Sequence, residues 1–445
     1  MILPQTAAAQ NRETDNVSIT VKADGKDVTM SPGGLVSLVI GFELNKVPWA
    51  RIIFSDGSVE SQEFAKSNQD VFSPGKTVEI LLGYNQQQES IFNGIIIKHA
   101  VKVQQARYYR LEIECRDAAV KTTVARKSRY FYEVSDKDLV QEIITDYPDL
   151  STGTLEDPGY KHKELVQYNV TDWDFMLLRA DANGLCLGMK DGALNMFKPT
   201  VKSTPDLQVQ FGIGGAGIPV LELESELDAR DHYPSVKGST WDYTRQEVME
   251  ETSGAGPLAV QAPGGGAQRD FPDVLYKNNP VQLYHGGDMD SQELSDWVDA
   301  KQQRGTLSHL KGRAAINGLK VVPGDTLEVN GVGDRFNGKH IISGVMHQVL
   351  NGHWKTDIQF GWDKNFAAER LEPAAADAAG LTGGIRGLHA GIVSKIAGDS
   401  RSGDYRVQVR LPFVAQNPDN TSADGVWARL VHIYAGDQRG FVFRP

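Results

Sequence analysis

Two distant segments of this chain repeat the same order of turn and strand residues. The first copy contains Pro74-Gly75, Thr77-Val78-Glu79-Ile80, Phe92-Asn93-Gly94, Ile95-Ile96-Ile97 and His99. The second contains Pro323-Gly324, Thr326-Leu327-Glu328-Val329, Phe336-Asn337-Gly338, Ile341-Ile342 and His347. Proline presets the φ angle of a turn, glycine supplies positive φ, and Asn-Gly favours a tight hairpin. We therefore predict two small β-barrels of the same fold, with the Pro-Gly and Asn-Gly turns in equivalent places.

Alternating apolar residues predict further β-strands at both ends of the chain. A period of two indicates a strand with one buried face. The predicted inward-facing sets are Val78, Ile80 and Leu82; Tyr109, Leu111, Ile113 and Cys115; and Val407, Val409 and Leu411. The first two sets belong to a β-rich region from Val17 to Asp117, and the third belongs to a separate β-rich region after His389.

Helices are predicted only between and beside these β-rich regions. Ser135 and Thr171 are side chains that cap helix N-termini, and an amphipathic run follows each of them. A third helix is expected from Ser291 to Gln303. The chain is therefore expected to combine β-barrels with an α/β segment.

The overall composition excludes several classes of protein. The 445 residues carry a net charge of −11, which argues against broad nucleic-acid binding because that needs a basic surface. No apolar run approaches the ~20 residues that cross a bilayer, and the N-terminus lacks the pattern of a secretory signal. Cys115 and Cys186 have apolar neighbours and form no CxxC motif, so we interpret both as buried core residues.

Motifs that could carry chemistry are weak. Residues 211–217 match GxGxxG by letter, but Ile218-Pro219 follows where a dinucleotide site needs a helix, so a flexible turn is predicted. Asp288, Asp290 and Glu293 lack the other ligands of a calcium loop and are expected at the start of a helix. His162 stands between two lysines and is predicted to be solvated. Trp241, Trp354, Trp362 and Trp427 are dispersed and interpreted as core residues. The prediction is no catalytic residue, no cofactor and no metal site.

Several segments together resemble the VgrG-type hub and spike proteins of type VI secretion, extracellular contractile injection systems and phage baseplates. They are Leu165–Leu185, Val236–Asp242, Pro323–His347, and Gly391–Gly436 with its Tyr405–Phe413 strand and Trp427-Ala428-Arg429. The resemblance covers nearly the whole chain in the same order. It implies a mainly β fold with α/β insertions: two related tube-type barrels, an intervening α+β domain and a C-terminal OB-fold. Family members usually continue into a β-helix needle, whereas this chain ends at Arg444-Pro445.

The resemblance also suggests a division into domains. The expected parts are a tail at 1–16, a first barrel at 17–118, an α+β domain at 119–235, a second barrel at 236–250 with 306–371, an insertion at 251–305, a linker at 372–387 and the base of the spike at 388–445. Gly, Ala and Pro dominate the linker and the stretch 252–272, so neither is expected to form a core.

The function implied by the resemblance is mechanical. A homotrimeric hub would cap an inner tube of Hcp-like protein, contact baseplate and effector or spike-tip proteins, adapt a sixfold tube to a threefold spike, and puncture a target envelope. Such a protein is made in the bacterial cytoplasm without a signal peptide and leaves the cell when the machine contracts. The alternative is a hub that carries a cell-wall hydrolase, whose site would have to lie in 119–235 or 251–305. A free secreted binding protein is a third possibility and would be a monomer.

Overall fold

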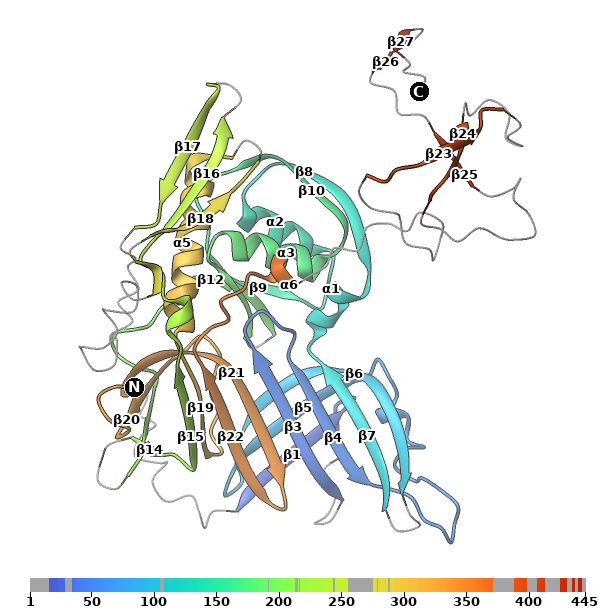
Figure 1. Cartoon of the computed structure of the whole chain (residues 1–445). Coiled ribbons are helices and arrows are strands. Elements are labelled where there is room, and N and C mark those ends of the chain that lie inside the picture. Colours follow the sequence, from blue (N-terminus) through green and yellow to red (C-terminus); the bar gives the residue numbers. More distant parts are fainter. Residues whose placement is uncertain are drawn as a thin grey trace. The chain divides into compact units, whose positions relative to one another are not determined.

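A computed structural model describes residues 16–441, apart from residues 29–33, 105–107, 191, 213–214, 216, 243–244, 255–274, 278, 287–288, 371–387, 398–405, 413–424, 430–433 and 437–438. The predicted tail before residue 16, most of the Gly- and Pro-rich stretch 252–272 and the predicted linker 372–387 therefore lie outside the described residues. The chain divides into two compact units, Met1–Ala374 and Ala375–Pro445 (Figure 1).

The first β-rich region of the larger unit folds as seven strands, which we call barrel I. They are β1 (Val17–Ala23), β2 (Lys26–Asp27), β3 (Leu35–Glu43), β4 (Trp49–Ser55), β5 (Thr77–Tyr84), β6 (Gln87–Gln104) and β7 (Tyr108–Arg116), with the short 3-10 helix η2 (Asp70–Phe72) before β5. The antiparallel order is β3-β4-β7-β6-β5-β1-β2.

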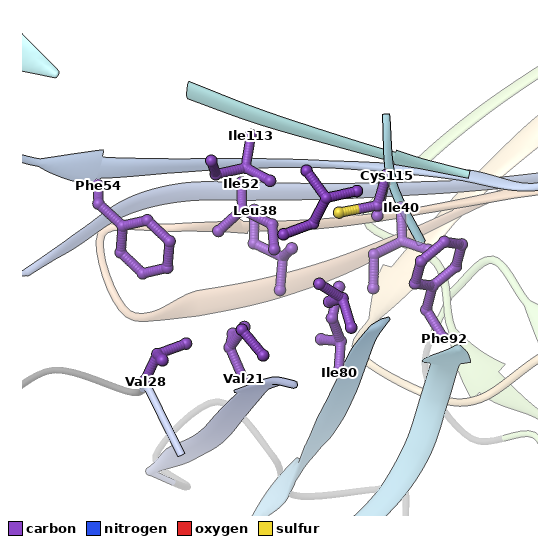
Figure 2. Packing of buried hydrophobic residues seen from close by; sticks show 14 of the residues in the cluster. Val21, Val28, Leu38, Ile40, Ile52, Phe54, Ile80, Phe92, Ile113 and Cys115 are labelled. Atoms are coloured by element: carbon purple, nitrogen blue, oxygen red, sulfur yellow. The ribbon is translucent and has the colours of Figure 1, made fainter. Parts of the chain in front are cut away.

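Barrel I encloses the predicted apolar residues except Tyr109, which is half-buried. Ile80, Leu82, Leu111, Ile113 and Cys115 are fully buried, as their alternation predicts. Figure 2 shows side chains of β1 and β5 facing side chains of β3, β4 and β7 across one core. Burying a side chain of this size contributes about 1.5–3 kcal/mol, so this core is a major source of the barrel's stability.

The second β-rich region forms barrel II, which receives strands from two parts of the chain. Its strands are β13 (Leu207–Gln210), β14 (Ile218–Pro219), β15 (Glu222–Leu227), β19 (Leu310–Asn317), β20 (Thr326–Asn330), β21 (Gly338–Leu350) and β22 (His353–Phe360). Their order is β15-β19-β22-β21-β20-β13-β14, and β13 and β20 run parallel.

Residues 236–250 do not belong to barrel II, contrary to the prediction. β16 (Val236–Asp242) pairs with β17 (Glu247–Thr252) and β18 (Val281–Tyr284), and one face of this sheet packs on α5 (Ser291–Ser308). Gly238 lies so close to Val298 of α5 that an added Cβ would be 2.5 Å from its side chain. The short acidic segment 222–227 is the strand that completes barrel II instead.

The repeat predicted from the two Pro-Gly motifs is visible in the backbone. Gly75 N donates to Ile96 O at 2.8 Å, and Ile96 N donates to Lys76 O at 2.9 Å. In barrel II, Gly324 N donates to Ile342 O at 2.8 Å, and Ile342 N donates to Asp325 O at 2.9 Å. A register shift follows each isoleucine, after Ile96 in β6 and after Ile342 in β21. Thr77 and Thr326 open equivalent strands, opposite Ile95 and Ile341.

The Asn-Gly motifs are less regular than predicted. Asn337-Gly338 ends a turn and begins β21, but Asn93-Gly94 lies inside β6, so the predicted turn at Asn93 is wrong. β6 continues through this position because Glu79 and Val78 of β5 pair with Asn93 and Gly94. The two motifs nevertheless occupy equivalent strands, with Gly338 two residues further from the common isoleucine pair.

The α+β domain lies between the barrel strands in sequence. It contains η3 (Ala118–Val120), α1 (Lys121–Val124), β8 (Arg126–Val134), α2 (Asp136–Thr145), β9 (Ser151–Leu155), β10 (His162–Thr171), α3 (Asp172–Ala182), β11 (Cys186–Lys190) and β12 (Ala193–Phe197), and η4 (Ala229–Asp231) follows β15. The predicted caps are confirmed: Ser135 forms a capping box with Asp138, and Thr171 accepts from Asp174 N. The larger unit ends its described part with α6 (Ala367–Arg370). Among the described helices, none has the length and apolar character to cross a membrane.

The smaller unit is described only in part. Its strands are β23 (Ile392–Lys395), β24 (Arg406–Arg410), β25 (Val426–Arg429), β26 (Tyr434–Gly436) and β27 (Arg439–Phe441). β24 pairs with β23 and β25. The predicted inward face of β24 is wrong in these strands: Gln408 is buried and accepts from Ser394 Oγ at 2.9 Å, whereas Val407 and Val409 are half-buried.

Candidate functional site

The strongest candidate for chemistry is a buried polar cluster in the α+β domain. Asp136 is fully buried at the start of α2, and Arg179 Nε of α3 donates to its Oδ1 at 2.7 Å. His162 Nε2 lies 3.2 Å from Asp136 Oδ2. Arg179 also donates to Glu293 Oε1 of α5 at 3.0 Å. His162 is only 8% exposed, so its predicted solvation is wrong: its neighbouring lysines point outward while β10 places it inside.

The electrostatics of this cluster favour a structural role. Burial would raise the pKa of Asp136, but the contacts with His162 and Arg179 outweigh burial and lower that pKa to about 2. Asp136 is therefore a charged partner for Arg179 at neutral pH, and the ion pair ties α2 to α3 and α5. Two other acids in this region are also buried: Asp172 contacts Lys127 and Arg129, and Asp181 contacts Arg304.

An open hollow of about 740 Å³ lies beside the barrels, lined by Phe42, Trp49, Ile97, Trp173 and Met346 among others. Glycoside hydrolysis needs two carboxyl groups facing such a space, one of them protonated. The two carboxylates lining this hollow are each held by a cation: Glu43 contacts Lys46 at 2.6 Å and Asp357 contacts Arg313 at 2.5 Å.

The weaker sequence motifs are accounted for as follows. Gly217 of the GxGxxG match is followed by β14, and the described part of that segment contains no helix. Asp290 caps α5 through Gln292 N at 2.8 Å, as expected for an acid at a helix start, while Asp288 lies outside the described residues. Both cysteines are buried, and burial raises the pKa of Cys115 to about 12. No group of three metal-binding side chains occurs among the described residues.

The prediction of buried tryptophans holds for Trp354 and Trp362 but fails for Trp241, and Trp427 is only half-buried. Trp241 is 38% exposed because α5 covers only the opposite face of its sheet. A stripe of exposed side chains, most of them aromatic, runs along the two-stranded β8–β10 sheet. Tyr130, Tyr132, Val166 and Tyr168 are each more than half exposed there, and the Tyr130 and Tyr132 rings stack.

The most extensive feature outside the cores is a continuous seam between the barrels. β21 of barrel II pairs with β3 of barrel I over seven residue pairs, from Gly344 opposite Glu43 to Leu350 opposite Ser37. Figure 1 shows these two strands side by side between the barrels. Val349 and Trp354 of barrel II join the apolar core of barrel I, and Trp354 stacks on Tyr84. The seam therefore joins the strands of both barrels into one continuous sheet.

An ion pair on the outer side of this sheet repeats with the barrels. Arg51 contacts Glu112 at 3.4 Å in barrel I, and Arg313 contacts Asp357 at 2.5 Å in barrel II. The strand pairings place both ion pairs in the same position, since Ala50 lies opposite Cys115 and Gly312 lies opposite Phe360. In both barrels the arginine follows the first of these residues by one position, and the acid precedes the second by three positions. This correspondence was missed from the sequence because β4 and β19 lie outside the repeated motifs.

Comparison with known proteins places the chain in a family. A family model described as the Alg8 N-terminal domain matches residues 13–351. The chain belongs to the Alg8 N-terminal domain family. A second model, the type VI secretion system/phage-baseplate injector OB domain, matches residues 389–445. No curated protein sequence matches this Alg8-family chain.

Solved structures share the fold at low sequence identity. A tail protein from Neisseria meningitidis MC58 matches with a TM-score of 0.55 and 12% identity, over 79% of this chain and 98% of that chain. The 43 kDa tail protein of prophage MuSo2 from Shewanella oneidensis matches with a TM-score of 0.55 and 10% identity, over 78% and 99%. Together with the OB-domain match, this fold confirms the predicted resemblance to hub and spike proteins of contractile systems.

Proposed function

We propose that the chain is a structural hub at the tip of a contractile injection machine and acts as a homotrimer. The observation that carries this proposal is the pair of barrels with one strand order, joined edge to edge in a single chain. Three chains supply six such barrels, which matches a sixfold tube, while the chain itself keeps the threefold symmetry of a spike.

The parts of the chain have separate tasks in this proposal. The two barrels cap an inner tube of Hcp-like protein, and the α+β domain with the β16–β18 sheet and α5 contacts baseplate proteins. The exposed stripe of Tyr130, Tyr132 and Tyr168 is suited to such contacts because aromatic residues are enriched at protein interfaces. The linker 372–387 leads to the base of the spike at 388–445, which carries spike-tip or effector proteins.

The proposed work is mechanical. The target membrane is contacted by force, with no catalytic residue, cofactor, metal or nucleic acid involved. The protein is assembled into the particle in the bacterial cytoplasm and leaves on contraction. The buried cluster around Asp136 has a structural use under this proposal, since each of its charges is paired.

The native mass of the purified protein tests the proposal. We expect three times the chain mass of 48.8 kDa, together with co-purification of tube and sheath proteins from producing cells. A monomer at micromolar concentration would contradict the hub proposal. Saturable peptidoglycan hydrolysis that disappears when Asp136 is replaced by Asn would favour the hydrolase alternative.

A further inference from the structure

β6 and β15, in the described part of the larger unit, each have a strand edge with no strand beside it. β6 pairs with β7 along Lys98–Gln104, and its other edge is uncovered over those residues. β15 pairs with β19, and its other edge is likewise uncovered. Uncovered edges present unpaired backbone donors and acceptors, and these can bind another strand.

The repeat shows what each uncovered edge corresponds to. Ile96 and Ile342 occupy the same position, so Lys98 corresponds to Gly344 and Val103 corresponds to Val349. By the same alignment, β15 corresponds to β3, with Glu224 in the position of Val39 and Leu223 in the position of Leu38. The two uncovered edges are therefore the counterparts of the two strands that form the seam within the chain.

We propose that the β6 edge of one chain pairs with the β15 edge of the next chain, in the register of the β21–β3 seam. This proposal rests on the homotrimer of the proposed function, and it names the surface that closes the ring. Transferring the register places Lys98 opposite Asp228, Lys102 opposite Glu224, and Val103 opposite Leu223. Repeated head-to-tail contacts of this kind form a closed ring when the rotation between copies closes.

Side-chain exposure supports the proposed pairing of β6 with β15 of the next chain. Val349 is 3% exposed in the seam opposite Leu38, whereas its counterpart Val103 is 60% exposed. His347 is 1% exposed opposite Ile40, whereas its counterpart Val101 is 41% exposed. Val349 and His347 are buried where β3 covers the edge of β21, and the proposed seam would bury Val103 and Val101 in the same way.

The charges on the two strand edges also support this pairing. The β6 edge carries Lys98 and Lys102, and the β15 segment carries Glu222, Glu224 and Glu226. Charged residues on an edge strand normally discourage pairing with another chain. Here the transferred register sets lysine against acid, so the charges disfavour pairing of β6 with β6 or of β15 with β15 and favour β6 with β15.

A disulfide between chains tests the register. In the double variant Val103→Cys/Leu223→Cys, the two thiols are directly opposite in adjacent chains, within the Cα separation that a disulfide spans. Under oxidised glutathione we expect most of the protein to run as a covalent trimer on a non-reducing gel and to return to monomer on reduction. The matched control Val103→Cys/Glu226→Cys is displaced by about 10 Å along the strand and should give no cross-link.

Native mass measured on the same samples separates the possible failures. A native trimer without cross-link would overturn the proposed seam and leave the hub proposal standing. A monomer would contradict both. Cross-linked dimers or an open ladder would overturn the closed ring.

A charge exchange provides a second readout that needs no cross-link. Lys102→Glu places two acids together and should weaken trimer formation at least tenfold, and adding Glu224→Lys should restore most of the loss. The same charge change at Lys26, in the β1–β2 hairpin, should have little effect. Equal weakening by the Lys26 variant, or failure of the second exchange to rescue, would overturn the proposed pairing of Lys102 with Glu224.

Discussion

Barrel I and barrel II share five antiparallel strands in one order, β3-β4-β7-β6-β5 and β15-β19-β22-β21-β20, but differ at their edges. The next strand is antiparallel in barrel I, where β1 pairs with β5, and parallel in barrel II, where β13 pairs with β20. The larger difference is that β21 is covered by β3 while the corresponding part of β6 is bare. This difference between the edges of two similar barrels is the observation behind the proposed pairing of β6 with β15 of the next chain.

The largest expected effect on stability comes from truncating a buried side chain in the core of each barrel. Phe54 and Ile316 occupy equivalent positions and are both fully buried, in separate apolar clusters. Phe54→Ala should lower the free energy of unfolding by about 3–5 kcal/mol and Ile316→Ala by about 2–5 kcal/mol. Urea unfolding should show additive losses in the double variant to within about 0.5 kcal/mol. Val59→Ala, at an exposed position, is the control. A strongly non-additive double variant would show that the cores are not independent.

Acid should destabilise barrel II more than barrel I. Burial lowers the pKa of His309 and His340 to about 4 and that of His347 to about 3. Below pH ~6.5 these histidines become protonated in the unfolded chain but stay neutral in the folded protein. Their contribution to the free energy of unfolding is therefore fully present above that pH and is lost as the pH falls toward the folded pKa values. The loss is at most about 1.4 kcal/mol per histidine per pH unit.

Amide hydrogen exchange at pH 7 and pH 5.5 measures this difference. Exchange should accelerate mainly in β19–β22, and His347→Gln should reduce the pH dependence of urea unfolding. Equal acceleration in both barrels, or an unchanged pH dependence in His347→Gln, would contradict the assignment of acid sensitivity to these histidines.

The repeated ion pair should matter more in barrel II. Asp357 is 4% exposed and contacts Arg313, Lys355 and Gln348, whereas the side chain of Glu112 is 15% exposed and its partners are half exposed. Asp357→Asn should cost about 1.5–3 kcal/mol of unfolding free energy, and Glu112→Gln about 0–1 kcal/mol. The hydrogen bond from Lys102 lowers the pKa of Glu112, so its small contribution is present above pH ~4.3 and disappears in stronger acid. Thermal unfolding of both variants at pH 7 checks the order, and a reversed order would contradict it.

The smallest expected effect on stability comes from replacing the glycine of each Pro-Gly turn. Gly75 and Gly324 have φ angles of +95° and +98°, where an L-residue is strained. An added Cβ at Gly324 would lie 2.9 Å from Phe197 Cζ, while nothing lies within 4 Å at Gly75. Gly75→Ala should cost about 1 kcal/mol and Gly324→Ala about 2 kcal/mol in unfolding free energy. Equal costs would mean that Phe197 moves aside.

The sequence predicted those parts of the fold that depend on residues close together along the chain. The Pro-Gly turns, the alternating strands and the caps at Ser135 and Thr171 all depend on residues close in sequence. Asn93-Gly94 shows the limit, because pairing with β5 overrides the preference of that dipeptide for a turn. β15 shows another limit, since its half-acidic sequence gives little sign of a barrel strand.

The candidate site was harder to predict than the fold. His162 stands between two lysines, and only the partners Asp136 and Arg179, from α2 and α3, explain its burial. The seam depends on the pairing of residues 344–350 with residues 37–43, which no spacing along the chain reveals. The repeat contained the necessary signal, but the uncovered edges became interpretable only once the two registers could be compared.

Electron cryomicroscopy of the assembled particle tests the central claim most directly. We expect six barrels around the axis, joined alternately by the β21–β3 seam within a chain and by a β6–β15 seam between chains. Lys102 should lie opposite Glu224 of the next copy, and Val103 should be buried. A ring in which the Lys98–Gln104 edge faces solvent, or pairs with the tube protein instead, would contradict it.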